Sequence, residues 1–382
     1  MFLRQITLAC SVAFSAPAAS AAVHYAKPTA SRSGDCSSWA NACTLSTALI
    51  TAVSGDQIWV KSGTYAPIAL TNGVKVYGGF AGTETAASQS NPATNVTIID
   101  GGGTTQCITG ADLAASTVVR GFTIRNGKDN SNDGGGGMVL ENSSAIMVQC
   151  IFENNKASMF GGAVAVRGTG SPQFINSIFR NNGESSGDNP EGGGALFAYS
   201  GYPAFVNCLF HGNKAGEGGV ALVYLANPVF VNCTFVGNEA TIGYGGAVHD
   251  PSGQTTFRNC IVWDNTTTRG VGWADQISTG WSGVSLVTHS DVEGGSGGTG
   301  NINTDPVFVN PGANDYRLNP YTSNLSPCID VGSVSFLPAD VGDLDWDNNQ
   351  TEQTPRDLDG NLRTKFGFVD MGAYEVTAIV DD

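Results

Sequence analysis

The sequence predicts an all-β solenoid, in which short strands wind into coils that stack on one another. Three observations lead to this fold class. One segment recurs between residues 118 and 270, the chain holds 51 glycines among 382 residues, and the recurring segments lack the 3.6-residue period of helices. Short β-branched and aromatic runs that recur with a period in the twenties, separated by Gly and Asn, are typical of stacked coils.

Composition and charge exclude several other classes of protein. A hydrophobic content of 41% argues against wholesale disorder, and glycine shows no period of three, which excludes collagen. The formal net charge of −15 repels phosphate groups, so we expect no nucleic-acid partner. No apolar run after residue 21 reaches the roughly 20 residues of a membrane helix, so we expect no membrane span in the mature protein.

The first 21 residues have the organisation of a secretory signal peptide. Arg4 precedes an apolar stretch from Ile6 to Phe14, and small residues lead to Ala21. We therefore predict that residues 1–21 are removed and that the protein is secreted or held at a bacterial cell surface. In such an oxidising compartment Cys36 and Cys43, which flank a short segment, are predicted to form a disulfide.

A short helix is predicted after this loop. Leu45, Leu49, Ile50 and Val53 form one apolar stripe, and the first strand is expected to begin at Ile58. The terminal coil of a solenoid exposes both its core and an unpaired strand edge, so the helix is expected to cap it. The predicted β-helix, including this cap, spans residues 22–335.

Each copy of the repeat is nine residues long, and every copy after the first ends with an asparagine. Its copies begin at Val119, Met147, Phe174, Phe205, Phe230 and Phe257. Glycine pairs recur in the same rhythm, at Gly136, Gly161, Gly193, Gly218 and Gly245. These copies predict about ten coils in the whole molecule.

Stacked coils place equivalent residues over one another, at about 4.8 Å between strands. Two-residue alternation then predicts an interior column that needs no disulfides, made of Phe122, Cys150, Ser177, Cys208, Cys233 and Cys260. The closing asparagines are predicted to form a structural ladder; they are Asn155, Asn182, Asn213, Asn238 and Asn265. The column that runs from Met147 to Phe257 falls on the outer face under strict alternation, so it is either brought inside by a bend or stacked outside.

The Gly-Gly-Ala-hydrophobic tetrapeptides at Gly161 and Gly245, paired with Phe-x-x-Asn at Phe179, Phe210 and Phe235, resemble the polymorphic outer membrane protein repeat. That resemblance implies a single-stranded right-handed parallel β-helix presented at bacterial surfaces. The barrel-forming domain of that family has no counterpart in this sequence, so autotransport is not expected.

The C-terminal part resembles the closing module of secreted β-helix proteins, polysaccharide lyases included. The matching segments lie at residues 305–308, 326–330, 357–363 and 370–375. We expect residues 336–382 to form an irregular acidic tail that closes the helix, with no anchoring signal after it.

Asp343, Asp345 and Asp347 alternate as in loops that turn carboxylates toward calcium, the one cofactor that the sequence suggests. An EF-hand would have glycine where Asn348 stands and glutamate where Thr354 stands, so any site here is of another type. Solvated acidic loops are the alternative.

Motifs for glycoside hydrolysis, a serine nucleophile or zinc are absent, whereas β-elimination needs only a base and a cation that neutralises the sugar carboxylate. Two outward columns bring cations to one corner of the coils. This basic strip comprises Arg125, Lys128, Glu153, Lys156, Arg180, His211 and Lys214. It is either an ion ladder around Glu153, a glycan-binding surface, or, in a lyase, a catalytic site formed by Arg180, His211, Lys156 and Lys214.

The leading prediction is a secreted or cell-surface β-helix that presents an extended surface for adhesion or carbohydrate binding. Its partner would be an extracellular polysaccharide or a cell-surface glycan. The alternative is a polysaccharide lyase that cleaves an acidic glycan such as pectate or alginate, and the sequence leaves open whether the protein is an enzyme.

Overall fold

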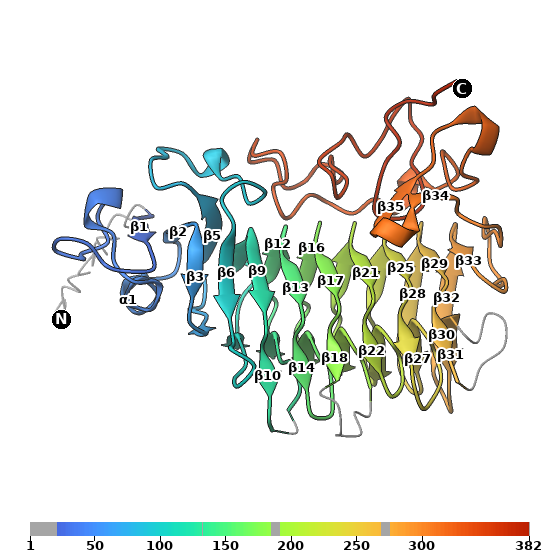
Figure 1. The fold of residues 1–382 in the computed structure, drawn as a ribbon, viewed down its shortest axis with the longest axis horizontal. Coiled ribbons are helices and arrows are strands. Elements are labelled where there is room, and N and C mark those ends of the chain that lie inside the picture. Colours follow the sequence, from blue (N-terminus) through green and yellow to red (C-terminus); the bar gives the residue numbers. More distant parts are fainter. Residues whose placement is uncertain (1–20, 132, 185–191, 269–275, 382) are drawn as a thin grey trace, which may run out of the picture.

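The chain winds into a right-handed parallel β-helix (Figure 1). The computed structural model describes residues 21–131, 133–184, 192–268 and 276–381. The predicted signal peptide lies outside these residues, apart from Ala21. Within them, no helix is both apolar enough and long enough to span a bilayer.

Four parallel sheets run along the molecule, and each is named here by a letter. Sheet A contains β1 (Val23–Ala26), β2 (Gln57–Lys61), β5 (Lys75–Phe80), β8 (Val118–Arg120), β12 (Ile146–Val148), β16 (Gln173–Ile175), β20 (Ala204–Val206), β24 (Val229–Val231), β28 (Gln254–Arg258) and β32 (Val284–Thr288). Sheet B contains β3 (Gly63–Tyr65), β6 (Thr97–Asp100), β9 (Phe122–Arg125), β13 (Ile151–Glu153), β17 (Ile178–Arg180), β21 (Leu209–His211), β25 (Thr234–Val236), β29 (Ile261–Trp263) and β33 (Asp291–Val292).

The other two sheets complete the coils. Sheet C contains β4 (Ile68–Ala69), β7 (Ile108–Ala111), β11 (Met138–Glu141), β15 (Val164–Arg167), β19 (Leu196–Tyr199), β23 (Ala221–Tyr224), β27 (Val248–Asp250) and β31 (Ile277–Thr279). Sheet D contains β10 (Lys128–Asp129), β14 (Lys156–Ala157), β18 (Gly183–Glu184), β22 (Lys214–Ala215), β26 (Glu239–Ala240) and β30 (Thr266–Thr267). A full coil therefore passes through sheets C, A, B and D in turn.

A left-handed asparagine at the corner between sheets A and B decides which side chains enter the core. Asn176 has φ 47° and separates β16 from β17. Because this residue resets the alternation of the strand, Phe174 before it and Ser177 after it both point inward and are fully buried. The phenylalanine column that the sequence left undecided is therefore inside the helix.

Two ladders of phenylalanine rings fill the core. Phe174 stacks on Phe205 with ring centroids 4.8 Å apart, and Phe179 stacks on Phe210 at the same distance. Rings of the two ladders meet edge to face, as Phe174 and Phe179 do at 5.7 Å. The cysteines of the predicted column are buried free thiols, as expected; they are Cys150, Cys208, Cys233 and Cys260.

The closing asparagines form a continuous buried ladder, as predicted. The side-chain oxygen of Asn213 accepts from both the backbone N–H and the side-chain amide of Asn182, at 3.1 and 3.0 Å. The amide of Asn213 in turn donates to Phe179 O and to the Asn238 side chain. Each coil is thus fixed to the next by polar groups that have no access to water.

The N-terminal cap differs from the prediction in two respects. The helix α1 (Leu45–Thr51) buries Leu45 and Leu49, whereas Ile50 is 84% exposed and Val53 63% exposed. Successive helical residues are rotated by about 100°, so Ile50 points away from the face that Leu49 presents. The first strand is β1, well before Ile58, and it pairs with β2. The predicted disulfide between Cys36 and Cys43 is present.

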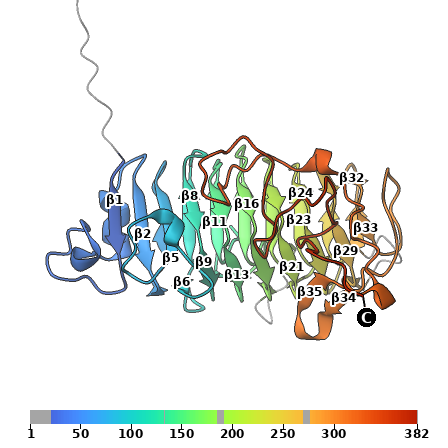
Figure 2. The same ribbon diagram turned by 90° about the horizontal axis from the view of Figure 1, so that it is seen from above.

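After β33 the chain turns back and runs along the outside of the coils (Figures 1 and 2). It forms an antiparallel hairpin of β34 (Phe308–Asn310) and β35 (Asp315–Leu318), and then an irregular segment. Leu344 of that segment packs against Val148 and Ile175 on the outer face of sheet A. The expected tail thus lies along the side of the helix, where outward apolar residues need covering, and not over its end. The predicted boundary at residue 335 falls within this returning segment.

Candidate functional site

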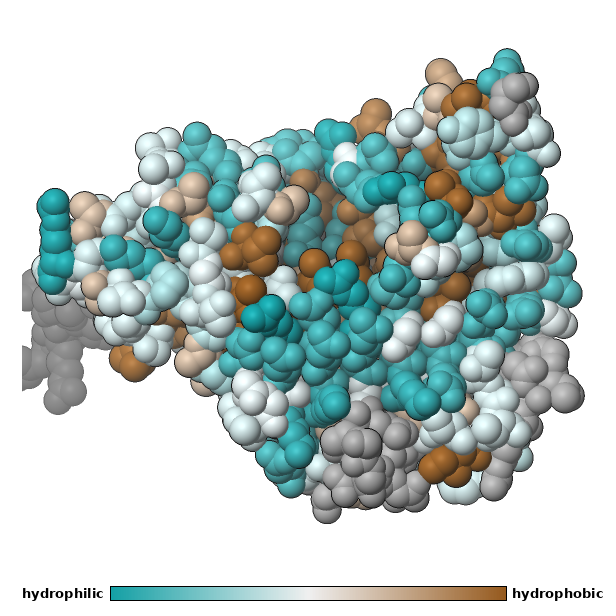
Figure 3. All heavy atoms as spheres, in the orientation of Figure 1, coloured by the Kyte–Doolittle hydropathy of each residue, from teal (hydrophilic) through white to brown (hydrophobic). Residues whose placement is uncertain are grey.

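Coil stacking brings the residues of the predicted basic strip together at the junction of sheets B and D. Glu153 is the register partner of both Arg125 and Arg180, and Arg180 is paired with His211. Three residues beyond the ends of β9 and β13, Lys128 is the register partner of Lys156. In Figure 3 this side of the molecule carries a broad hydrophilic area.

Three cations of the strip, Arg125, Arg180 and Lys214, are neutralised by an acidic neighbour. Arg180 Nε donates to Glu153 Oε2 at 2.9 Å, and Lys214 Nζ to Glu239 Oε2 at 2.9 Å. Arg125 Nε donates to Asp100 Oδ2 at 2.8 Å, and the Asp100 carboxylate also accepts from Gly102 N–H and the Asn126 side chain. Although partial burial acts to raise it, these hydrogen bonds lower the pKa of the Asp100 carboxyl. This part of the strip is the ion ladder that the sequence offered as one alternative.

His211 is covered by the returning chain. It is 7% exposed, and its ring centroid lies 5.4 Å from that of Tyr316 in β35. Burial, together with the neighbouring Arg180, lowers the pKa of His211 from 6.5 to about 4. The imidazole is therefore neutral at pH 7 and is not presented to a polymer in solvent.

Lys128 and Lys156 differ from the other cations. They lie in adjacent coils, and no carboxylate pairs with either among the ion pairs of the described residues. Like charges directly opposite one another on adjacent strands destabilise a sheet unless an anion lies between them. Both side chains border a surface depression of about 630 Å³, whose other lining residues are Gly102, Gly103, Asn126, Gly127 and Asn154.

The backbone explains why this depression is open. Asn126 and Asn154 end their sheet B strands in the left-handed conformation, with φ 51° and 55°. Each turn sends the chain into sheet D, where the lysine follows. Gly127 is held by the buried Asn155 Oδ1, which accepts its N–H at 2.9 Å. The depression is thus built on the rigid asparagine ladder.

A second depression, of about 620 Å³, is lined by residues of or next to β23, β27 and β31 of sheet C. Its lining includes three aromatic side chains, Tyr224, Tyr244 and Trp281, and the last is 93% exposed. Glu217 and His249 complete it, with Glu217 Oε2 3.7 Å from His249 Nε2. Aromatic faces beside a carboxylate suit the stacking and hydrogen bonding of a sugar ring. Sequence reasoning missed this site because its residues come from three different coils.

The returning chain carries three groups of acidic side chains whose ligand atoms lie within 4.8 Å of one another. One is the predicted set of Asp343, Asp345 and Asp347. The second consists of Asp340, Asp345 and Glu352, and the third of Asp330, Asp370 and Glu375.

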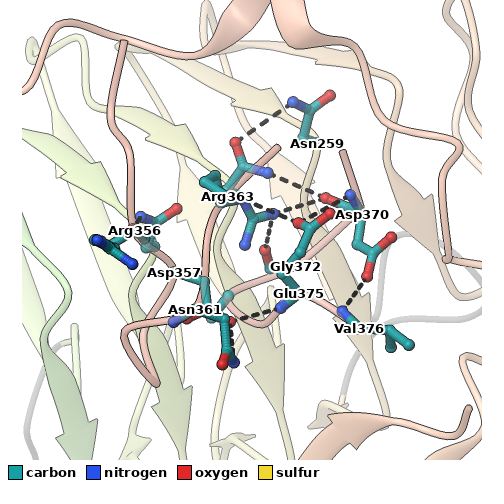
Figure 4. Close-up of polar contacts among 12 residues, drawn as sticks. Asn259, Arg356, Asp357, Asn361, Arg363, Asp370, Gly372, Glu375 and Val376 are labelled. Carbon is teal, nitrogen blue, oxygen red and sulfur yellow. Dashed lines mark hydrogen bonds and ion pairs between the residues drawn. The ribbon is translucent and has the colours of Figure 1, made fainter. Parts of the chain in front are cut away.

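The third group belongs to a closed structural clasp (Figure 4). The fully buried Arg363 lies with its Nε 3.5 Å from Glu375 Oε2 and donates to Asp370 O and Gly372 O. Asp370 accepts from two backbone N–H groups through its two oxygens. The carboxylates of this clasp are therefore already used to fold the segment.

A column of asparagines at the corner of sheets A and B holds the returning chain, a role that sequence reasoning missed. Asn207 donates to Arg356 O at 2.7 Å and Asn232 to Asp370 O at 3.1 Å. Asn259 donates to Ser333 O at 3.0 Å, and Asn176 donates to Asp357 O. The signal was present in the sequence, because asparagine stands at the third position of four consecutive repeat copies, those beginning at Phe174, Phe205, Phe230 and Phe257.

Comparison with known proteins supports the fold and leaves function open. No curated protein matches the chain. The crystal structure of the pectate lyase Pel9A is similar over 94% of this chain and 97% of that one, at 15% identity and a TM-score of 0.44, which supports no inference about activity. Residues 107–293 match the family model described as the right handed beta helix region. Residues 107–293 are thus similar to that family, and the chain folds as a right-handed parallel β-helix.

Proposed function

We propose that this protein is an extracellular β-helix that binds an acidic polysaccharide at the junction of sheets B and D. One observation carries the proposal. Lys128 and Lys156 lie on adjacent coils, border an open depression, and have no carboxylate partner among the described ion pairs. Secretion or a cell-surface location, supported by the N-terminal sequence, is part of the proposal.

The chemistry of the depression suits a uronate polymer. Two ammonium groups can each meet a sugar carboxylate, and the exposed amide of Asn154 can hydrogen-bond to hydroxyls. Gly102 and Gly103 leave room for a sugar ring to approach the backbone. The volume of about 630 Å³ lies in the range usual for ligand sites.

The test measures binding of polygalacturonate and of alginate by calorimetry in the presence of a chelator. Dextran is the neutral control polymer. The double variant Lys128→Ala/Lys156→Ala should lose binding, because it removes both unpaired cations. Lys27→Ala/Lys75→Ala is the matched control, since it makes the same change of net charge away from the depression. Binding should weaken steeply with salt, because the Debye length is only about 8 Å at physiological ionic strength.

Equal binding by both double variants would overturn the proposal, as would binding of dextran alone. The same samples should be assayed for the ultraviolet absorbance of unsaturated uronate products. Of the four residues considered for a lyase, Arg180 and Lys214 are ion-paired and His211 is buried, so Lys156 alone is exposed without a described ion pair. Product formation that is lost in Lys156→Ala would establish the lyase alternative in place of simple binding.

The aromatic depression favours a second candidate function, binding of a neutral sugar. Trp281 and Tyr244 offer exposed ring faces, and Glu217 offers a carboxylate acceptor. Trp281→Ala should abolish salt-insensitive binding to neutral polymers if the protein has this function. Trp39→Ala would not serve as a matched control, because Trp39 packs on Tyr25. Binding that persists in Trp281→Ala would rule the site out.

A further inference from the structure

The segment 340–352 of the returning chain concentrates negative charge against the side of the β-helix. It holds Asp340, Asp343, Asp345, Asp347 and Glu352 and contains no Lys or Arg. One carboxylate oxygen from each of Asp340, Asp345 and Glu352 comes within 4.8 Å of the other two. Three carboxylates converge on one point although the chain could have spread them into solvent.

Each of the three converging side chains has one buried carboxylate oxygen without a hydrogen-bond donor. Asp340 Oδ1, Asp345 Oδ1 and Glu352 Oε1 have no partner in the structure. Asp340 is only 1% exposed, and its other oxygen accepts the Leu344 N–H at 2.7 Å, which fixes the direction of the side chain. Buried polar atoms in proteins are nearly always paired, so three unpaired oxygens around one point indicate a missing ligand.

No side-chain cation of the described residues fills this role. Arg120 of β8, which contacts the segment, is 3% exposed, and its guanidinium donates to Gly342 O at 3.2 Å and Asp343 O at 2.9 Å. It also lies 3.9 Å from the centre of the Trp346 ring. Arg120 thus holds the backbone of the segment, and the described ion pairs include none of its five carboxylates.

We propose that Asp340, Asp345 and Glu352 bind a calcium ion. Three unpaired carboxylate oxygens in an irregular loop can bind a hard cation. Calcium tolerates irregular coordination geometry, whereas magnesium requires a nearly ideal octahedron. The ligand set differs from the sequence prediction and shares only Asp345 with it. Asp343 and Asp347 each use one oxygen to accept a loop N–H, from Asn348 at 3.1 Å and Asn349 at 2.6 Å, and neither is among the described residues with a buried unpaired oxygen.

Calcium at this point would fasten the returning chain to sheet A. The segment already touches the coils through Leu344, which packs against Val148 and Ile175, and through the Arg120 hydrogen bonds. Without the ion, the carboxylates of Asp340, Asp345 and Glu352 face one another, and each has an oxygen without a donor. Their mutual repulsion then opposes docking of the segment, and a bound calcium ion would remove that repulsion. The site lies away from Lys128 and Lys156, so its test is independent of glycan binding.

The experiment titrates the chelator-treated full-length protein with calcium chloride, by calorimetry and by thermal unfolding. The wild type should bind the ion and unfold at a higher temperature. Asp340→Asn and Glu352→Gln should each weaken binding by about tenfold or more. Glu141→Gln is the matched control, because Glu141 is an exposed acid of β11 outside the segment, and it should respond as the wild type does.

Unfolding temperatures with and without calcium distinguish the proposed ligand role of Asp340 from a purely structural role. If the ion is the missing partner, Asp340→Asn in chelator should unfold no lower than the wild type in chelator, because it removes a buried unpaired charge. Equal destabilisation with and without calcium would overturn the proposal, and so would a wild type that neither binds calcium nor changes its unfolding temperature at millimolar concentrations. Glu352→Gln keeps the test decisive if Asp340→Asn fails to fold, because the Glu352 side chain accepts only one long bond, from Asn349 at 3.4 Å.

Discussion

At the scale of single residues, asparagine has two separate roles in the four repeat copies that begin at Phe174, Phe205, Phe230 and Phe257. Asn213 lies inside and links neighbouring coils, whereas Asn207, six residues earlier, turns the corner with φ 51° and donates to the returning chain. The first role needs an amide that can both donate and accept in a ladder. The second needs a residue that tolerates a positive φ and carries a donor. Asparagine meets both needs, which explains its place at two points of the same repeat.

His211 gives a test of burial at this scale. Its pKa is lowered from 6.5 to about 4 in the folded state, so between these values the unfolded chain binds a proton that the folded chain does not. Stability should therefore fall as pH falls from about 6.5 to about 4, by up to about 3 kcal/mol from this residue. His211→Phe keeps a ring beside Tyr316 and removes the titration.

The measurement is the free energy of unfolding of His211→Phe relative to the wild type across this pH range. The difference should shift in favour of the variant as pH falls, and the titration of buried acids cancels in the comparison. A difference that does not change with pH would show that His211 is solvated in the folded protein.

At the scale of elements, the returning chain is held to the coils by a buried clasp. Arg363→Met should lower the free energy of unfolding by about 3 kcal/mol or more, because it leaves Glu375 buried without its cation. Arg317→Met is the control, since Arg317 pairs with Asp315 and Asp359 at an exposed site and such pairs contribute under about 1 kcal/mol.

Limited proteolysis of the clasp variants locates the effect. Cleavage of Arg363→Met should increase within residues 330–376, while the coils stay protected. Equal protease resistance of the Arg363 and Arg317 variants would show that the clasp does not hold the segment in place.

At the scale of the whole molecule, the returning chain connects coils that are far apart in the stack. Trp346 meets Tyr77 of β5 with ring centroids 5.6 Å apart, and the backbone of Ser333 accepts from Asn259, which follows β28. In a simple solenoid each coil contacts only its neighbours. The returning chain adds long-range contacts to that pattern and covers apolar residues that face outward from sheet A.

Truncation after residue 335 tests this coupling. The shortened protein should unfold at a lower temperature and bind a hydrophobic dye, because Ile146, Val148, Ile175 and Val206 lose their cover. The same change would remove calcium binding if the proposed site is correct. An unchanged unfolding temperature, with no dye binding, would mean that the segment docks without stabilising the coils.

The local sequence pattern was enough to predict most of the stacked coils of the β-helix. The period of the repeat, the glycine pairs and the two-residue alternation were enough to predict the stacked coils, the buried column at Cys208 and Cys233, and the asparagine ladder, because in a solenoid residues that are equivalent in sequence become neighbours in space. The strip at Arg180 and Lys156 was found for the same reason.

Tertiary structure alone decided the features that depend on chain segments without a common period. The left-handed corner at Asn176 placed Phe174 inside, and the returning chain buried His211 under Tyr316. The grouping of Asp340 with Glu352 likewise depends on how an irregular segment folds back on itself. Such contacts join residues distant in sequence through side-chain packing, and no local pattern of residues encodes where they meet.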